Sequence, residues 1–268
     1  VVSSRGINEA LSKQSRTLNV VRYAGFVDMP ETLYITGEGS EAGDEIKDAR
    51  RFTKLEDGVF EIYTQLKANE EFKFVEAKLA ELEGFCIQKD SIIQIDSKKE
   101  PEITGGTITE DGIYRIKLDF NTAVPKFEKI TKVWMFYNID NGNNYELAYE
   151  GNGVWKGSGA ITIKGVSWAS SGETRYKYKM NVDGAEESWG HLEENRDVAV
   201  DANTSSSYFN IYKQTSGDGW AYSFRYSRTL LGLPSNVGNG NSATSAVAAF
   251  TLYFNTDSSD NYHQAWTY

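Results

Sequence analysis

Leu33-Tyr34-Ile35-Thr36-Gly37 opens a pattern that this chain contains twice. The first copy continues through a turn at 55–60 and ends in the aromatic-Lys-aromatic segment 72–74. The second copy consists of 133–137, 149–155 and 176–178. In both copies a strand is followed by a gap, by a turn built on Gly with Asp or Asn, and by two further strands. A repeat of this length predicts two similar β-domains in tandem.

Length and composition support the same prediction. The chain has 268 residues, of which 40% are hydrophobic and 25% charged, as in a folded protein. Aromatic residues make up 13% and Gly is frequent, a composition that favours strands and turns over helices. We therefore expect an all-β chain of two antiparallel β-sandwich domains. The first would span 17–125 and the second 126–268, after a linker or N-terminal extension at 1–16.

The expected strands of the first domain follow from short apolar runs bounded by turn residues. They are 17–27, 32–36, 58–66, 71–76, 84–88, 91–96 and 112–119, with short helices at 8–14 and 76–82. In the last strand, Tyr114, Ile116 and Leu118 alternate with Ile113, Arg115 and Lys117. This alternation is typical of a sheet with one face on the core and one face in water.

We expect a hinge between the domains at 121–126, where Pro125 would interrupt strand pairing. The expected strands of the second domain are 131–137, 145–149, 153–157, 160–163, 174–181, 208–212, 220–225 and 247–254. The Gly-, Ser- and Asn-rich stretch 232–246 is expected to be a flexible loop. The sequence assigns no role to residues 230–268.

Several classes of function are disfavoured. A net charge of −10 argues against a nucleic-acid partner, which needs clustered basic residues. The single cysteine, Cys86, excludes an internal disulfide and reads as a buried thiol. No apolar stretch is long enough to span a membrane. Because the chain does not begin with Met, we expect it to be trimmed, with any export signal or lipid anchor preceding it.

Catalytic and metal-binding signatures are missing from the sequence. The two histidines, His191 and His263, are far apart and have no ligand-spaced partners, so neither a metal nor a cofactor is expected. The segment 140–144 reads as a surface turn rather than a calcium loop. The carboxylate pairs 186–187 and 193–194 could serve glycoside hydrolysis. Because the chain has 38 acidic residues, adjacent pairs also arise by composition alone, and we expect these carboxylates to be solvent-exposed surface charges.

The tryptophans are more informative. Trp134 and Trp155 fall within strand patterns and are expected in the core. Trp168, Trp189 and Trp220 fall in polar, small-residue segments, where an indole stays exposed unless a ligand or the protein itself covers it. The flat C–H faces of sugar rings stack on such rings, and nearby amides and charges bond their hydroxyls. The candidate ligand-binding residues are Trp189, Trp168, Lys177, Arg175 and Trp220.

The segments 33–37, 57–60, 71–74, 175–180 and 183–190 resemble the repeated domains of the SusE and SusF family of starch-binding surface lipoproteins of Bacteroidetes. The resemblance covers roughly 30–120 and 130–225. It implies immunoglobulin-like or starch-binding-module-like sandwiches that bind glycan without cleaving it. It also implies a lipid anchor at the outer membrane, and an oligo- or polysaccharide and other glycan-uptake proteins as partners.

The same resemblance implies that Trp189 is an aromatic platform with Lys177 or Arg175 as its basic neighbour. The first copy has no Trp, which suggests a spacer rather than a binding domain. Two other functions stay open. A structural or adhesin-type module would cover its aromatics with a protein partner. A glycoside hydrolase would need two carboxylates across a cleft.

Overall fold

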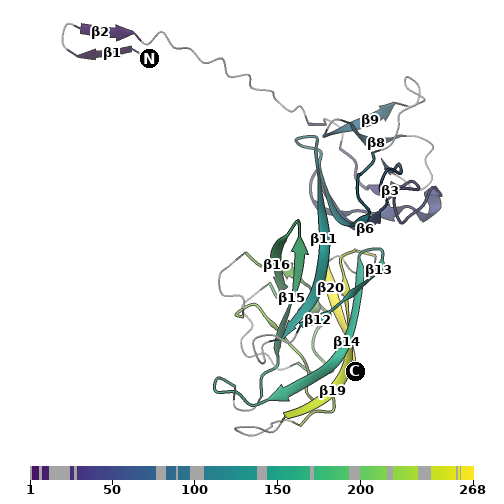
Figure 1. The fold of residues 1–268 in the computed structure, drawn as a ribbon, viewed down its shortest axis with the longest axis vertical. Helices are drawn as coiled ribbons and strands as arrows, with labels where there is room; N and C mark the ends of the chain where they lie inside the picture. The colour runs from purple at the N-terminus through teal and green to yellow at the C-terminus, as the bar shows by residue number, and fades with distance from the viewer. Residues whose placement is uncertain are drawn as a thin grey trace.

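The computed structural model describes residues 2–5, 8–11, 25–26, 29–76, 83–88, 90–96, 106–137, 144–169, 172–192, 200–215, 220–234, 243–257, 259 and 261–268. These residues form β-strands and two short 3₁₀ helices, with no α-helix among them (Figure 1). Every pair of neighbouring strands is antiparallel. The prediction of an all-β, antiparallel sandwich fold is confirmed.

The largest sheet has nine strands and is called the shared sheet. Its main path is β17 (Tyr212–Lys213), β16 (Ala185–Gly190), β15 (Arg175–Val182), β11 (Val124–Tyr137), β10 (Gly112–Asp119), β6 (Val59–Leu66) and β5 (Thr53–Glu56). Two short strands join it from the side: β12 (Asn144–Glu146) pairs with β11, and β18 (Phe224–Arg225) pairs with β15.

Two smaller sheets pack against the shared sheet. The first outer sheet consists of β4 (Arg50–Arg51), β3 (Tyr34–Thr36), β7 (Lys73–Val75), β8 (Glu83–Gln88) and β9 (Ser91–Asp96). The second outer sheet consists of β13 (Ala148–Gly151), β14 (Val154–Lys164), β19 (Ala243–Tyr253) and β20 (His263–Thr267). The remaining elements are the hairpin of β1 (Val2–Arg5) and β2 (Asn8–Leu11) and the 3₁₀ helices η1 (Ile46–Asp48) and η2 (Ser206–Phe209).

Strand β11 belongs to both halves of the molecule. Its first part, from Val124 to Ile130, pairs with β10, and its second part, from Ile130 to Tyr137, pairs with β15. A bulge between Ile130 and Lys132 marks the point where the pairing changes sides. Figure 1 shows this strand running from one half of the molecule into the other. The two sandwiches are therefore joined by a continuous strand rather than by a loop.

The two hydrophobic cores lie on opposite faces of the shared sheet. Successive side chains of a strand point to opposite faces. In β10, Ile116 and Leu118 belong to the first core, under the first outer sheet. The partner of Ile113 in β11 is Ile130, which belongs to the second core, under the second outer sheet. Tyr63 of β6 likewise belongs to the second core, whereas Ile62, the residue before it, belongs to the first core.

Three sequence expectations are wrong. Residues 121–126 form no hinge, because β11 begins at Val124 and Pro125 lies opposite Leu118 within the sheet. The second face of 112–119 is only partly open to water, since Arg115 is 6% exposed while Ile113 and Lys117 are half-buried. Residues 8–11 are a strand and not part of a helix, because they pair with 2–5 in a hairpin. The expected helix at 76–82 and most of the expected strand at 17–27 fall outside the described residues.

Other strand predictions are close to the structure. Strands β3 and β6 to β10 lie where expected, whereas β4 and β5 were not predicted. Asp57-Gly58 makes a turn between β5 and β6, as the turn signal indicated. The expected strands 153–157 and 160–163 are one strand, β14. The expected loop 232–246 ends in β19, since residues 243–246 already pair with β14. The division of the chain into domains at residue 125 stays a prediction, because both cores share β11.

Candidate ligand-binding site

Trp168 lies in the turn that joins β14 to β15. Two backbone hydrogen bonds between Val166 and Ala169 close this turn, with N···O distances of 3.1 and 3.0 Å. The described residues of this turn leave the indole uncovered, and Trp168 is 61% exposed. Its expected exposure is confirmed. A large aromatic ring presented to solvent in this way is a surface that a ligand could occupy.

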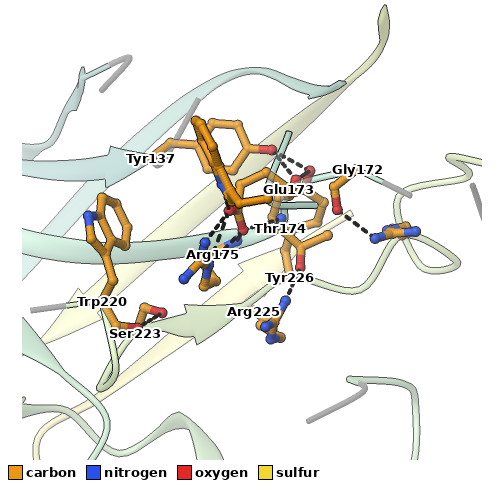
Figure 2. Close-up of polar contacts among 11 residues, drawn as sticks. Tyr137, Gly172, Glu173, Thr174, Arg175, Trp220, Ser223, Arg225 and Tyr226 are labelled. Carbon is orange, nitrogen blue, oxygen red and sulfur yellow. Dashed lines mark hydrogen bonds and ion pairs between the residues drawn. The ribbon is translucent and has the colours of Figure 1, made fainter. Parts of the chain in front are cut away.

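The polar edge of Trp168 is fixed by a buried carboxylate. Its Nε1 donates a hydrogen bond of 2.8 Å to Oε2 of Glu173, a residue with no exposed surface. Glu173 also accepts hydrogen bonds of 2.9 Å from the backbone N–H groups of Thr174 and Arg175. The guanidinium of Arg175 completes the set with an ion pair of 2.6 Å (Figure 2). The exposed ring of Trp168 is therefore fixed through the hydrogen bond of its Nε1 to the buried carboxylate.

These contacts decide the charge of Glu173. Burial raises the pKa of this carboxyl, because a charged group loses its hydration. The hydrogen bonds from Arg175 and Trp168 lower the pKa by more, so that it lies below its usual range. Glu173 is thus ionised at neutral pH and holds both Trp168 and Arg175 in place.

Trp220 continues the site on the other side of Arg175. The guanidinium carbon of Arg175 lies 5.9 Å from the centre of the Trp220 ring. Trp220 stacks on Phe136 of β11, with ring centres 5.4 Å apart and an angle of 28° between the planes. Lys177 lies over Trp220 at 5.0 Å, and Lys179 lies over Phe136 at 4.3 Å. At these distances a cation and the aromatic face beneath it attract each other.

We call this set of residues the Trp168 cluster: Trp168, Glu173, Arg175, Trp220, Phe136, Lys177 and Lys179. The alternation of β15 explains how it assembles. Tyr176 and Tyr178 face the second core, so the three basic residues between and beside them share the opposite face of the shared sheet. Phe136 reaches the same face from β11, which pairs with β15. The cluster offers aromatic faces, charged N–H donors and one exposed ring, as a sugar-binding surface requires.

Four of the five predicted site residues meet in this cluster, namely Trp168, Arg175, Lys177 and Trp220. Whether they bind a ligand stays a prediction. Lys177 is nearly buried and Trp220 is half-buried, so Trp168 presents most of the free aromatic surface. The sequence reasoning missed Phe136, Glu173 and Lys179. The alternation in 133–137 and 174–181 placed Phe136 and Lys179 on strand faces, but it could not show that those faces adjoin.

The expectation that Trp189 is an exposed loop platform is wrong. Trp189 lies in strand β16, paired with Tyr178, and is only 5% exposed. Its ring packs edge-on against Phe254 at 4.9 Å and also contacts Tyr262. Neither Lys177 nor Arg175 is its neighbour, since both project from the opposite face of the shared sheet. Trp189 belongs to the second core.

A signal in the sequence could have placed Trp189 correctly. Asp183 and Gly184 both have positive φ, 48° and 79°, and form the two-residue turn of a hairpin in which Val182 pairs with Ala185. Asp-Gly between two strands favours this kind of turn. Counting from Ala185 by twos places Trp189 on the face of Val182, which is the core face.

Both carboxylates of the pair 186–187 form ion pairs with basic side chains. Burial raises the pKa of Glu187, but hydrogen bonds from Arg115 and Lys213 outweigh it and hold the pKa below its usual range. Glu186 bonds Lys179. A general acid for glycoside hydrolysis needs the opposite, a raised pKa. The pair 193–194 and the segment 138–143 lie outside the described residues.

The described residues contain no group of three or more His, Cys, Asp or Glu side chains placed to hold a metal ion. Within the same part of the chain, no helix has the length and apolar character needed to cross a membrane. Cys86 is free and buried, as expected.

Comparison with known proteins gives little further guidance. No protein-family model matches the chain. No curated protein matches it either. Among solved structures, the chain is similar to the crystal structure of SusF from Bacteroides thetaiotaomicron, with a TM-score of 0.28 and 12% sequence identity over 89% of this chain and 49% of that chain. The chain thus spans about half the length of that protein. A likeness this low supports no conclusion about ligand or location.

Proposed function

We propose that this protein binds oligo- or polysaccharides without cleaving them, and that Trp168 is the ring on which a sugar stacks. One observation carries the proposal. Trp168 is 61% exposed, yet its N–H is held by Glu173, which has no exposed surface. A ring that is already fixed loses little conformational entropy when a ligand binds, which favours affinity.

The surroundings of Trp168 support the same function. Arg175 and Lys177 lie beside the aromatic rings of the Trp168 cluster and carry N–H groups that can bond sugar hydroxyls. The first core is built mainly from Phe, Ile and Leu and has no comparable cluster among the described residues. A spacer role for the first sandwich agrees with that composition.

Native affinity electrophoresis on a panel of immobilised polysaccharides tests the proposal. We expect at least one polysaccharide to retard the wild type, and Trp168→Ala to weaken its binding tenfold or more, about 1.4 kcal/mol. The matched control is Val247→Ala, because Val247 is an exposed apolar residue of the second outer sheet, 74% exposed and outside the Trp168 cluster. This control should bind as the wild type does.

Two outcomes would count against the proposal. If wild type and Trp168→Ala migrate alike on every polysaccharide, the exposed ring serves a protein partner instead, as an interaction module would use it. Release of reducing sugar by the wild type would show a hydrolase. Attachment to the outer membrane and contact with other glycan-uptake proteins rest on the sequence resemblance alone, and proteolysis of intact cells would test the first of these.

A further inference from the structure

A second concave surface lies on the other face of the shared sheet. It is a groove of about 680 Å³ between the two halves of the molecule. The first half contributes residues of β5, β6, β10 and β11, including Glu61 and Lys117. The second half contributes Trp189, Tyr212 and Tyr262. Pockets for small ligands have volumes of this order, about 300–1,000 Å³, and favour the junction of two domains.

The walls of the groove are rigid. Arg115 is tied to Glu128 at 2.6 Å and to Glu187 at 2.8 Å, so that one guanidinium links β10, β11 and β16. From the other side, the hydroxyl of Tyr262 donates a hydrogen bond of 2.9 Å to Glu61 of β6. These contacts cross the junction that the continuous strand β11 already bridges. A groove between two fixed walls keeps its shape for a ligand.

The groove is basic although the chain is acidic. Its lining includes the basic residues Lys54, Arg115, Lys117, Lys126 and Lys213 but only two acidic ones, Glu61 and Glu128. The net charge of the whole chain is −10. Basic side chains thus outnumber acidic ones in the lining, which favours an anionic ligand over a cationic one.

Most of these basic groups already have a carboxylate partner. Lys126 bonds Glu128, Lys213 bonds Glu187, and Lys54 bonds residues outside the groove. Lys117 differs, because its ammonium makes no hydrogen bond or ion pair within the part of the chain that the structure describes. Opposite it, Glu61 is buried and already bonded by Tyr262. Lys117 is therefore the group in the groove that can take a new anion.

The aromatic wall of the groove identifies the rest of the ligand. Trp189 and Tyr262 each expose less than a tenth of their surface, and Tyr212 is half-buried. The indole N–H of Trp189 is buried without an acceptor among the described residues. Trp189 and Tyr262 are therefore the largely covered floor of the groove, and Tyr212 presents the accessible ring. A ring near the ammonium of Lys117 suits a molecule with an apolar face, hydroxyl groups and an anionic substituent.

We propose that this groove is a second ligand site, separate from the Trp168 cluster, and that it takes an acidic saccharide whose carboxylate pairs with Lys117. The inference is independent of the proposed function of Trp168, because the two sites lie on opposite faces of the shared sheet and share no residue.

Isothermal titration at low ionic strength tests the groove. The probes are short oligomers of galacturonic, guluronic and glucuronic acid, each compared with the same oligomer after reduction of its carboxylates to alcohols. We expect at least one acidic oligomer to bind tenfold or more tightly than its reduced form, and its affinity to fall as salt is added. Lys117→Met should reduce this affinity fivefold or more.

Two variants serve as controls. Lys73→Met removes a half-buried lysine from a strand of the first outer sheet, away from the groove, and should leave the affinity unchanged. Trp168→Ala should also leave it unchanged. Loss of binding in Trp168→Ala with none in Lys117→Met would place the anion at the Trp168 cluster and overturn the groove proposal while supporting the proposed function. Equal binding of acidic and reduced oligomers, or no binding of any acidic oligomer, would also overturn it.

Discussion

Trp168 and Trp189 occupy similar stretches of sequence, each among small and polar residues, yet they end in opposite surroundings. Trp168 is 61% exposed and is held at its N–H by Glu173. Trp189 is 5% exposed and is held by ring contacts with Phe254 and Tyr262, while its N–H has no partner among the described residues. One ring is fixed by its polar edge and the other by its faces. The polarity of the neighbouring residues therefore does not decide whether an indole is available to a ligand.

The difference comes from strand register. Trp189 follows a two-residue hairpin turn, so the alternation of β16 turns it toward the second core. Trp168 lies in a turn whose residues do not pair across a sheet, apart from the bridge between Val166 and Ala169. Nothing in the described turn brings an apolar surface over it.

The largest difference should appear in stability. Trp189→Ala removes a buried ring and leaves a cavity, so it should lower the free energy of unfolding by about 3–5 kcal/mol. Trp168→Ala removes a mostly exposed ring and should lower it by less than about 1 kcal/mol, the cost of one hydrogen bond. Urea denaturation followed by circular dichroism measures both. Equal losses for the two variants would contradict the contrast between the regions.

The next effect concerns the anchor of Trp168. Glu173→Gln replaces a carboxylate that accepts hydrogen bonds from Trp168 and Arg175 with an amide that has only one acceptor oxygen. We expect the free energy of unfolding to fall by about 1–3 kcal/mol, as for hydrogen bonds to a charged group. Sugar affinity should fall several-fold, because the ring loses its fixed orientation.

A matched control for that variant is Glu45→Gln. Glu45 pairs with Lys47 at 3.7 Å, and the side chains of both residues are 74% exposed. Exposed pairs of this kind contribute little to stability. The control should change neither the unfolding midpoint nor the affinity. If Glu173→Gln behaved like this control, Glu173 would not be the anchor of Trp168.

The smallest effect is a dependence on pH that has opposite signs in the two regions. Near Trp189, burial raises the pKa of Glu61 above its ordinary value of 4.5, and the hydrogen bond from Tyr262 and the charges of Arg115 and Lys117 offset only part of this. The folded state then binds more protons than the unfolded state above pH 4.5, so stability falls as pH rises through this window. Glu61→Gln should raise the melting temperature at pH 8 and lose this advantage toward pH 4.

Glu173 should respond in the other direction. The pKa of its carboxyl is lowered from 4.5, so the stability that it contributes is present above this value and is lost as pH falls through the lower, folded-state pKa. Glu173→Gln should therefore be most harmful at neutral pH and approach the wild type in acid. Thermal melts of both variants between pH 3 and pH 8 measure the two slopes. If the difference in melting temperature from the wild type changed with pH in the same direction for both variants, the opposite pKa shifts of Glu61 and Glu173 would be refuted.

Much of the fold could be predicted from the sequence, because it depends on local patterns. The period-2 alternation in 112–119 and 174–181 and the Asp-Gly turn at 57–58 locate strands that the structure contains. Several wrong expectations concern residues whose surroundings depend on strand pairing. Pro125 pairs within a sheet because β10 folds back beside it, and Arg115 is buried because Glu128 and Glu187 neutralise it.

The candidate site was likewise predictable in part. The residue types of the Trp168 cluster were predictable, since exposed indoles beside basic residues suit sugar binding. Their assembly was not, because Phe136, Trp220 and Arg175 lie far apart along the chain and meet only through the pairing of β11 with β15. The groove next to Trp189 gave no sequence signal, since its walls come from strands of both halves.

Local sequence patterns were enough to predict that this protein is built of antiparallel strands, since strand alternation and turn chemistry act over a few residues. They also indicated which aromatic and basic side chains could serve a ligand. Only the tertiary structure decided that one long strand joins two cores on opposite faces of one sheet. The turn at Asp183 and Gly184 places Trp189 on the strand face of Val182, but Trp189 is buried because other segments pack over that face in the second core. Trp168 stays exposed because the described residues leave its ring uncovered.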